Sequence, residues 1–350
     1  MGDKYQCDFL LDLYSHLKDY ETKTGLSVLP SLQSVLLAPA VWSINLSERK
    51  TSILLEVLKL QPEKKQVELT GCSHEESEVR SFLQCLPYIS QLSAGPEFFQ
   101  RVCTSISVRS REEAQQLESL LQLLGFQLLL TGQLHRRTCC SVGRVLKLCG
   151  SKVDLILTPS KMSVRGAAVL FRHTTPLHSL RLSIGMSLLL SQWVRRGRVV
   201  CPLAVEELSL VPEKVQPSER VLLRAVSGLA SLLRYWTIGR LDLTETCIPA
   251  QCLITLLLHD GPLTIRLSEK NFQQLLVLLH EIQDKNLTLS FLSKLGGDLS
   301  SCCLNWELLL YLLQQSSAQT ITVDLRKNLF LQEETTRLLP FLDRIVFKRW

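Results

Sequence analysis

One sequence pattern constrains the fold of this chain more than any other. It consists of an apolar residue, two residues of any type, a second apolar residue, one residue of any type, and a third apolar residue. Its clearest copy runs from Ile238 through Leu241 to Leu243. Side chains two positions apart point to the same face of a β-strand, so the pattern predicts a strand that buries one face. The small side chain of Cys247 follows, where we expect the backbone to turn, and residues 249–259 fit a helix. Strand, turn and helix together form a unit that can be repeated.

Copies of the strand pattern recur along most of the chain. Ile44 and Val67 anchor two predicted strands 23 residues apart, within the period of roughly 20 to 29 residues that short strand-and-helix repeats show. After Gly150 the predicted strands are anchored at Leu155, Leu180, Leu208, Leu241, Ile265, Leu287, Val323 and Ile345. Amphipathic segments between them predict helices over residues 162–172, 185–195, 218–235, 269–282, 306–314 and 332–342.

The spacing is less regular in two places. Between Ile89 and Leu148 we expect strands at 89–92, 105–108 and 126–130, helices over 111–124 and 142–148, and an exposed loop over 133–138. The longest interval, between Leu287 and Val323, contains Gly296 and Gly297. Because two adjacent glycines usually interrupt a helix or strand, we expect a loop insertion there.

The first 38 residues do not show the strand pattern and look helical. Four apolar side chains define one predicted face of a first helix: Phe9, Leu10, Leu13 and Leu17. This helix is expected to end at Thr24-Gly25, before a second helix over 28–37. Repeat arrays need a cap at an open end, so we predict a helical N-terminal cap over residues 1–40. Residues 41–350 are then one continuous array, because no Pro-, Gly- or Ser-rich linker divides them.

The composition narrows the functional classes. Charged residues make up 21% of the chain, which argues against disorder, and the net charge of +6 is a weak bias. The basic clusters are scattered and most fall where helices are expected to end, so we expect no nucleic-acid partner. No apolar run approaches the roughly 18 to 20 residues of a membrane helix, and no membrane association is expected. The N-terminus lacks the apolar core of a signal peptide, which favours a cytoplasmic location.

The sequence lacks the common short motifs that carry catalysis or bind cofactors. The twelve cysteines include no Cys-x-x-Cys pair, and most are interpreted as buried thiols. There is no phosphate-binding Gly-x-x-x-x-Gly-Lys-Ser/Thr loop, and no His-Glu-x-x-His or Gly-x-Ser-x-Gly motif. The segment His74-Glu75-Glu76 lies at a predicted helix start, where carboxylates are favoured electrostatically. We therefore expect no enzyme activity, no cofactor and no metal site.

The repeated units resemble leucine-rich repeats of the ribonuclease-inhibitor type. The residues that carry this resemblance are Val323-Asp-Leu325-Arg-Lys-Asn328-Leu329, Leu241-Asp-Leu243 with Cys247, and Val67-Glu-Leu69 with Cys72. The amino-acid sequences at 42–46 and 267–271 are similar to the divergent repeats of fish NLR-type innate-immune proteins. The resemblance covers roughly residues 41–347. It implies an α/β leucine-rich-repeat solenoid, a horseshoe with a parallel concave sheet and convex helices.

The residue between the two apolar positions of each strand should point away from the core, onto the concave face. These candidate protein-binding residues are Asn45, Glu68, Arg181, Asp242, Arg266 and Asp324. With mixed charges on a wide surface, they favour a non-enzymatic scaffold that binds a protein partner. Two alternatives stay open: the ligand-sensing region or a partner of an NLR-type receptor, and a hydrolase whose site is assembled across strands. A ubiquitin-ligase adaptor would need an additional recruiting module, for which we expect the termini to leave no room. It is equally open whether these six residues are merely exposed strand residues.

Overall fold

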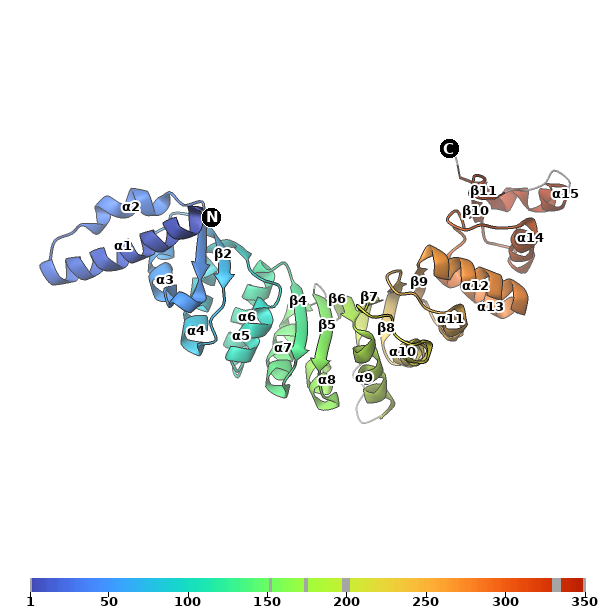
Figure 1. Cartoon of the computed structure of the whole chain (residues 1–350), viewed down its shortest axis with the longest axis horizontal. Coiled ribbons are helices and arrows are strands. Elements are labelled where there is room, and N and C mark those ends of the chain that lie inside the picture. The colour runs from blue at the N-terminus through green and yellow to red at the C-terminus, as the bar shows by residue number, and fades with distance from the viewer. Residues whose placement is uncertain (1, 151–152, 173–175, 197–201, 329–334, 349–350) are drawn as a thin grey trace. The chain divides into compact units, whose positions relative to one another are not determined.

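The computed structural model describes residues 2–150, 153–172, 176–196, 202–328 and 335–348. Within these ranges the chain is an α/β protein in which strands and helices alternate, as Figure 1 shows. Every strand pair with a described register is parallel, which confirms the predicted class. The chain divides into two compact units, Met1–Leu177 and His178–Trp350. The predicted division near residue 40 stays a prediction.

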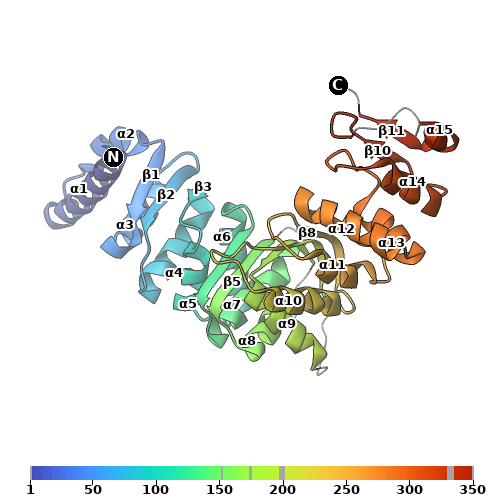
Figure 2. The same ribbon diagram turned by 45° about the vertical axis from the view of Figure 1, so that its right-hand side comes forward.

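Unit 1 begins with the two predicted helices, α1 (Gly2–Thr24) and α2 (Leu29–Leu37). Figure 2 shows them beside β1 (Val41–Asn45), and α1 packs against β1, which is the outer strand of its sheet. The buried face of α1 consists of Cys7, Leu10, Leu11 and Tyr14. Phe9, predicted to be on that face, is 63% exposed, because the buried stripe lies one position further along the helix.

The rest of unit 1 repeats strand and helix. Strands β1, β2 and β3 form one sheet in chain order, and β4 pairs with β5. Trp42 pairs with Val67 and Ile44 with Leu69, so the structural repeat is 25 residues rather than the predicted 23. The remaining bounds are α3 Thr51–Lys59, β2 Lys65–Gly71, α4 Glu76–Cys85, β3 Ile89–Ser93, α5 Phe98–Ser105, α6 Arg111–Leu123, β4 Gln127–Gln133, α7 Arg136–Cys149, β5 Asp154–Lys161 and α8 Val164–Phe171, with 3₁₀ turns at Leu46–Glu48 and Leu86–Tyr88.

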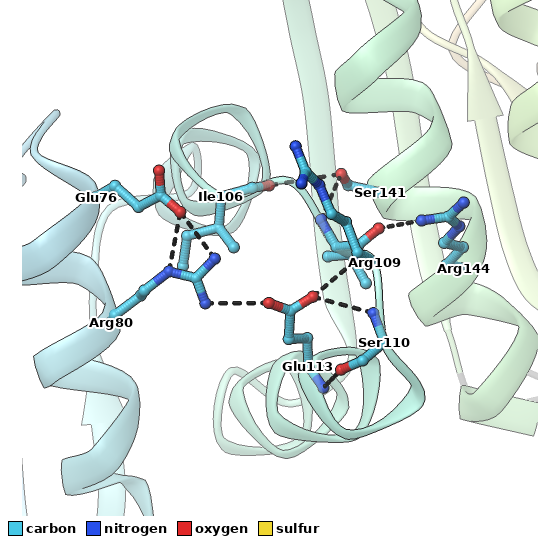
Figure 3. A network of polar contacts seen from close by, with 9 residues as sticks. Glu76, Arg80, Ile106, Arg109, Ser110, Glu113, Ser141 and Arg144 are labelled. Atoms are coloured by element: carbon cyan, nitrogen blue, oxygen red, sulfur yellow. Dashed lines mark hydrogen bonds and ion pairs between the residues drawn. The ribbon is translucent and has the colours of Figure 1, made fainter.

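The predicted strand at residues 105–108 is wrong. Ile106 and Val108 are buried, as the alternation indicated, but the segment belongs to no strand. Side chains of α7 bind its backbone instead. The hydroxyl of Ser141 donates to the carbonyl of Ile106 (3.5 Å) and accepts from the amide of Val108 (3.4 Å), and Arg144 donates to the carbonyl of Val108 (Figure 3). Buried backbone groups need partners, and here side chains supply them in place of a neighbouring strand.

The prediction for residues 133–148 is also partly wrong. Instead of an exposed loop followed by a short helix, α7 begins at Arg136 and is 14 residues long. Its buried residues follow helical spacing from the first turn, but several are small or polar, including Thr138, Cys139 and Ser141. A pattern built on large apolar residues misses such a helix, because these side chains are buried without being strongly apolar.

Unit 2 continues the alternation. Strands β6 to β9 are neighbours in chain order, and β10 pairs with β11. In Figure 1 helices α10 and α11 lie on one side of the strands that they connect. The bounds are β6 Leu177–Leu182, α9 Ile184–Arg195, β7 Ala204–Leu210, α10 Glu219–Leu232, β8 Thr237–Leu243, α11 Ala250–Leu257, β9 Thr264–Leu267, α12 Glu269–Ile282, α13 Lys285–Leu295, α14 Trp306–Gln315, β10 Ile321–Val323, α15 Thr335–Leu338, a 3₁₀ helix at Leu339–Arg344, and β11 Ile345–Phe347. The first three residues of the predicted helix 332–342 lie outside the described residues.

Leu287 was predicted to anchor a strand, but it lies in helix α13. The carboxylate of Asp284 caps this helix by accepting from the amide of Leu287 (2.9 Å). The strand-like contact occurs later, at the expected loop insertion, where Asp298 forms a parallel bridge with Thr322. Gly297 permits this approach, because a Cβ there would lie 2.1 Å from the carbonyl oxygen of Thr320. The buried residue that corresponds to a strand anchor is therefore Leu299.

Most described cysteines are buried, as expected. Seven of the eleven are buried and all eleven are free thiols. Burial raises the pKa of Cys85 and Cys149 to about 12, and that of Cys139 and Cys302 to about 11. These thiols therefore stay protonated and pack as small apolar groups. Separately, no helix within the described ranges has the length and apolar character that crossing a membrane requires.

A polar network fixes the start of α6 in unit 1 (Figure 3). Ser110 and Glu113 form a capping box, in which the Ser110 hydroxyl accepts from the Glu113 amide and the Glu113 carboxylate accepts from the Ser110 amide, both at 3.1 Å. The same carboxylate pairs with Arg80 of α4 (3.1 Å) and accepts from the amide of Arg109 (2.6 Å). The amides of Arg109 and Ser110, followed by Arg80, lower the pKa of Glu113 below 4.5.

We expect Glu113→Ala to lower the free energy of unfolding by about 1 kcal/mol at pH 7, because it removes the carboxylate half of the capping box and the hydrogen bond that this carboxylate accepts from the Ser110 amide. Because the folded-state pKa of Glu113 is depressed, its contribution is complete above pH 4.5 and disappears as the pH falls through the folded-state value. Urea unfolding of Glu113→Ala and of Glu112→Ala, a neighbouring exposed carboxylate in the same first turn, measures this. Equal losses in the two variants would contradict the role of the capping box.

Candidate functional site

Three of the six candidate residues make the same kind of turn. The side-chain oxygen Oδ1 of Asn45, Asp242 or Asp324 accepts from the backbone amide two residues later, at 3.0, 2.9 and 2.9 Å. In each case the residue stands between two apolar residues near the end of a strand. Such turns are the usual local role of Asn and Asp. These three side chains therefore shape the exit from the strand, a role that the sequence pattern did not reveal.

Asp324 also differs in exposure. It was expected on an open face, but it is only 3% exposed. The guanidinium of Arg326 binds both carboxylate oxygens, with Nη2 to Oδ2 at 2.6 Å and Nε to Oδ1 at 3.0 Å. The bonds from the side chain and the amide of Arg326 lower the pKa of Asp324 to about 2. Within the chain, the carboxylate of Asp324 is already paired.

The two candidate arginines occur in a different local setting. Arg181 and Arg266 also stand between apolar residues, but each is followed two positions later by a serine that caps the next helix. Ser183 accepts from the amide of Met186 (3.2 Å) and Ser268 from that of Asn271 (3.3 Å). Because the serine satisfies the helix start, the arginine side chain is left to lie over the sheet.

The strands of unit 2 place these arginines on one charged surface. We call it the polar strand face and define it as Arg181, Glu207, Ser209, Arg240, Asp242, Glu245 and Arg266. Residues that pair in register bring opposite charges together: Glu207 with Arg240 and Asp242 with Arg266. Their ion pairs measure 3.0 and 3.6 Å, and Arg181 pairs with Glu245 at 2.7 Å. Apolar residues adjacent to these in the strands, such as Leu208, Leu241 and Leu243, are fully buried.

A small hollow of about 90 Å³ lies in the polar strand face. Its lining comprises Arg181, Glu207, Ser209, Leu210, Asp242, Thr244 and Glu245. Within the described part of the chain, the buried Nε of Arg181 has no hydrogen-bond partner. A buried donor without an acceptor is unfavourable, so this position suits an acceptor supplied from outside the chain.

The structure brings Arg181, Asp242 and Arg266 of the predicted set together, with ion-pair partners that the prediction did not name. Glu207 and Arg240 lie two residues before Ser209 and Asp242 on the same strands, so period-2 alternation places them on the same face. This signal was present in the sequence. Glu245 lies beyond the strand in a turn, and the strand pattern gives no sign of it. Glu68 is exposed on β2 of unit 1, opposite Ser43 of β1, and Asn45 belongs to that same unit.

The backbone turns at residues 244–246, before Cys247, where the turn was expected. Cys247 is exposed, and its thiol donates to Oδ1 of Asn271 of α12 (4.0 Å), whose Nδ2 donates to the carbonyl of Thr246 at 3.0 Å. Asn328 is placed differently. Its Oδ1 accepts from the amide of Leu304 and its Nδ2 donates to the carbonyl of Asp324 (2.7 Å). Asn328 therefore joins two successive strand-and-helix repeats within unit 2.

In the residues that the structure describes, no group of three or more His, Cys, Asp or Glu side chains is placed to hold a metal ion. The polar strand face thus offers paired charges and one unsatisfied donor as its chemistry. In the comparisons with known proteins, no protein-family model matches the chain and no curated protein is similar to it.

Proposed function

We propose that the chain is a non-enzymatic scaffold that binds a protein partner through the polar strand face. The observation that carries this is the hollow at Arg181, where a buried Nε lacks an acceptor beside solvent-accessible ion pairs. An exposed ion pair contributes only about 0 to 1 kcal/mol to stability, so a partner's charges can replace one with little loss. The side chain of Arg266 is 56% exposed and can exchange Asp242 for such a partner.

We further propose that the strand-and-helix repeats of the chain are divergent leucine-rich repeats of the ribonuclease-inhibitor type, arranged as a solenoid. Asn328 supports this, because its side chain bonds both its own turn and the preceding strand-and-helix repeat. Such a pair of bonds explains why the pattern Leu-x-x-Leu-x-Leu-x-x-Asn prefers asparagine at that position. By the same resemblance, we propose innate-immune sensing as the setting and the cytoplasm as the location.

The test is affinity purification with three forms of the full chain: wild type, Arg181→Glu/Arg266→Glu, and Arg220→Glu/Arg224→Glu. The last variant makes the same charge change on exposed residues of α10. We expect the first double variant to lose captured proteins that the other two forms retain, with affinity for them reduced at least roughly tenfold. Melting temperatures close to that of the wild type establish that each variant is folded. Identical sets of captured proteins from all three forms would remove the case for this face.

A further inference from the structure

A second charged feature belongs to unit 1 and shares no residue with the polar strand face. A groove of about 380 Å³ is lined by Arg136, Cys140, Gly143, Arg144 and Lys147 of α7 and by Val169 and Arg172 at the end of α8. Four of the seven lining residues are cations and none is a carboxylate. Apart from the adjacent pair Gly143 and Arg144, successive lining residues of α7 are three or four positions apart, so they form one stripe along the helix.

Gly143 explains how the groove is formed. A Cβ at this position would lie 2.9 Å from the carbonyl oxygen of Val169 and 3.0 Å from that of Leu170. The absence of a side chain therefore lets the backbone at the end of α8 lie directly on α7. The cationic residues of α7 before and after Gly143 line the same groove.

Ion pairs within the described residues do not account for three of the four cations in the groove. Among the described residues, no carboxylate forms an ion pair with Arg136, Arg144 or Lys147. Arg144 donates to the neutral carbonyl of Val108, as Figure 3 shows. Lys147 lies in the last turn of α7, where a cation is favoured electrostatically, but Arg136 lies in the first turn, where the helix dipole opposes it.

The length of the stripe indicates the size of the ligand. Arg136 and Lys147 are 11 residues apart, which corresponds to about 16 Å along a helix. A single phosphate contacts only part of a stripe of this length, whereas a chain of linked phosphoryl groups contacts more of it. Arginine binds phosphoryl oxygens with two parallel hydrogen bonds, and a groove of this volume is within the range of small-molecule sites.

We propose that the groove between α7 and α8 binds a small molecule that carries several consecutive phosphoryl groups. Arg136, Arg144 and Lys147 contact the anion along α7, and Cys140 lies beside it. This site is independent of the protein-binding function proposed above, since it belongs to the other unit and uses different residues.

The test is isothermal titration of the full chain with inorganic tripolyphosphate and with orthophosphate. We expect tripolyphosphate to bind at least roughly tenfold more tightly, because the longer and more highly charged anion contacts more of the stripe. The variant Arg136→Gln/Lys147→Gln should lose roughly tenfold or more in affinity. Arg165→Gln, which removes an exposed cation of α8 outside the groove, should bind as the wild type does. Arg144 is left unchanged, since its bond to Val108 contributes to folding.

Alkylation of cysteines gives a second readout. Cys140 is half-buried in the groove, while Cys247 and Cys303 are exposed in unit 2. With tripolyphosphate bound, we expect slower iodoacetamide labelling of Cys140, located by peptide mass mapping, and unchanged labelling of the other two. Equal affinity of the wild type and Arg136→Gln/Lys147→Gln would overturn the proposal. So would tighter binding of single-stranded RNA or of phosphatidylserine vesicles than of tripolyphosphate, since these point to a macromolecular or membrane surface.

Discussion

Leu243→Asp is expected to unfold unit 2, with a loss of at least about 4 kcal/mol in the free energy of unfolding. Leu243 is fully buried on β8 and pairs in register with Leu267 of β9. The substitution removes the burial of a leucine, which contributes about 1.5 to 3 kcal/mol, and leaves a buried carboxyl group without a partner. Hydrogen exchange followed by mass spectrometry measures the effect peptide by peptide, and we expect protection to fall across 178–350.

The matched control is Thr237→Asp, which places the same side chain at an exposed position on the same strand. We expect its unfolding curve and exchange pattern to match those of the wild type. A cooperative unfolding transition for Leu243→Asp within about 1 kcal/mol of the wild type would contradict the assignment of β8 as a core strand, because surface substitutions have effects of that size.

Asn328→Leu is expected to cost about 2 to 4 kcal/mol of stability, since two buried hydrogen bonds are lost and their partners remain unsatisfied. The side chain of Asn328 is buried and bonds the amide of Leu304 and the carbonyl of Asp324. Leucine has a similar volume but cannot replace either bond. Chemical denaturation with urea, monitored by circular dichroism, gives the difference in free energy.

Asn286→Leu is the control for this substitution, because Asn286 is exposed on helix α13. It should change stability by no more than about 0.5 kcal/mol. If the two variants are equally stable, Asn328 does not join successive strand-and-helix repeats, and the main structural support for the leucine-rich-repeat interpretation is lost.

The strands that were predicted correctly are those in which sequence alternation and sheet pairing agree. At β7, β8 and β9, the registers place Leu208, Leu241 and Ile265 side by side, as the spacing indicated. Alternation alone fails where other groups supply the backbone partners. Residues 106–108 alternate like a strand, yet Ser141 and Arg144 of α7 bind their backbone. Such contacts connect residues more than thirty positions apart, which no local pattern contains.

The candidate site shows the same limit. The rule that the residue between two apolar positions faces outward located Arg181 and Arg266 on the polar strand face. It did not separate them from Asn45, Asp242 and Asp324, whose short side chains bond the backbone two residues later. That distinction follows from residue type, because Asn and Asp favour such turns and arginine does not. The ion-pair partner Glu245 required the fold, since it lies outside any strand.

The central claim is that the polar strand face recognises a protein partner. Its most direct test is the dissociation constant of the most abundant protein captured by the wild type, measured by biolayer interferometry for each purified form. Arg181→Glu/Arg266→Glu should bind this partner at least roughly tenfold more weakly than the wild type, while Arg220→Glu/Arg224→Glu should bind with unchanged affinity. Equal dissociation constants for all three forms would contradict the claim.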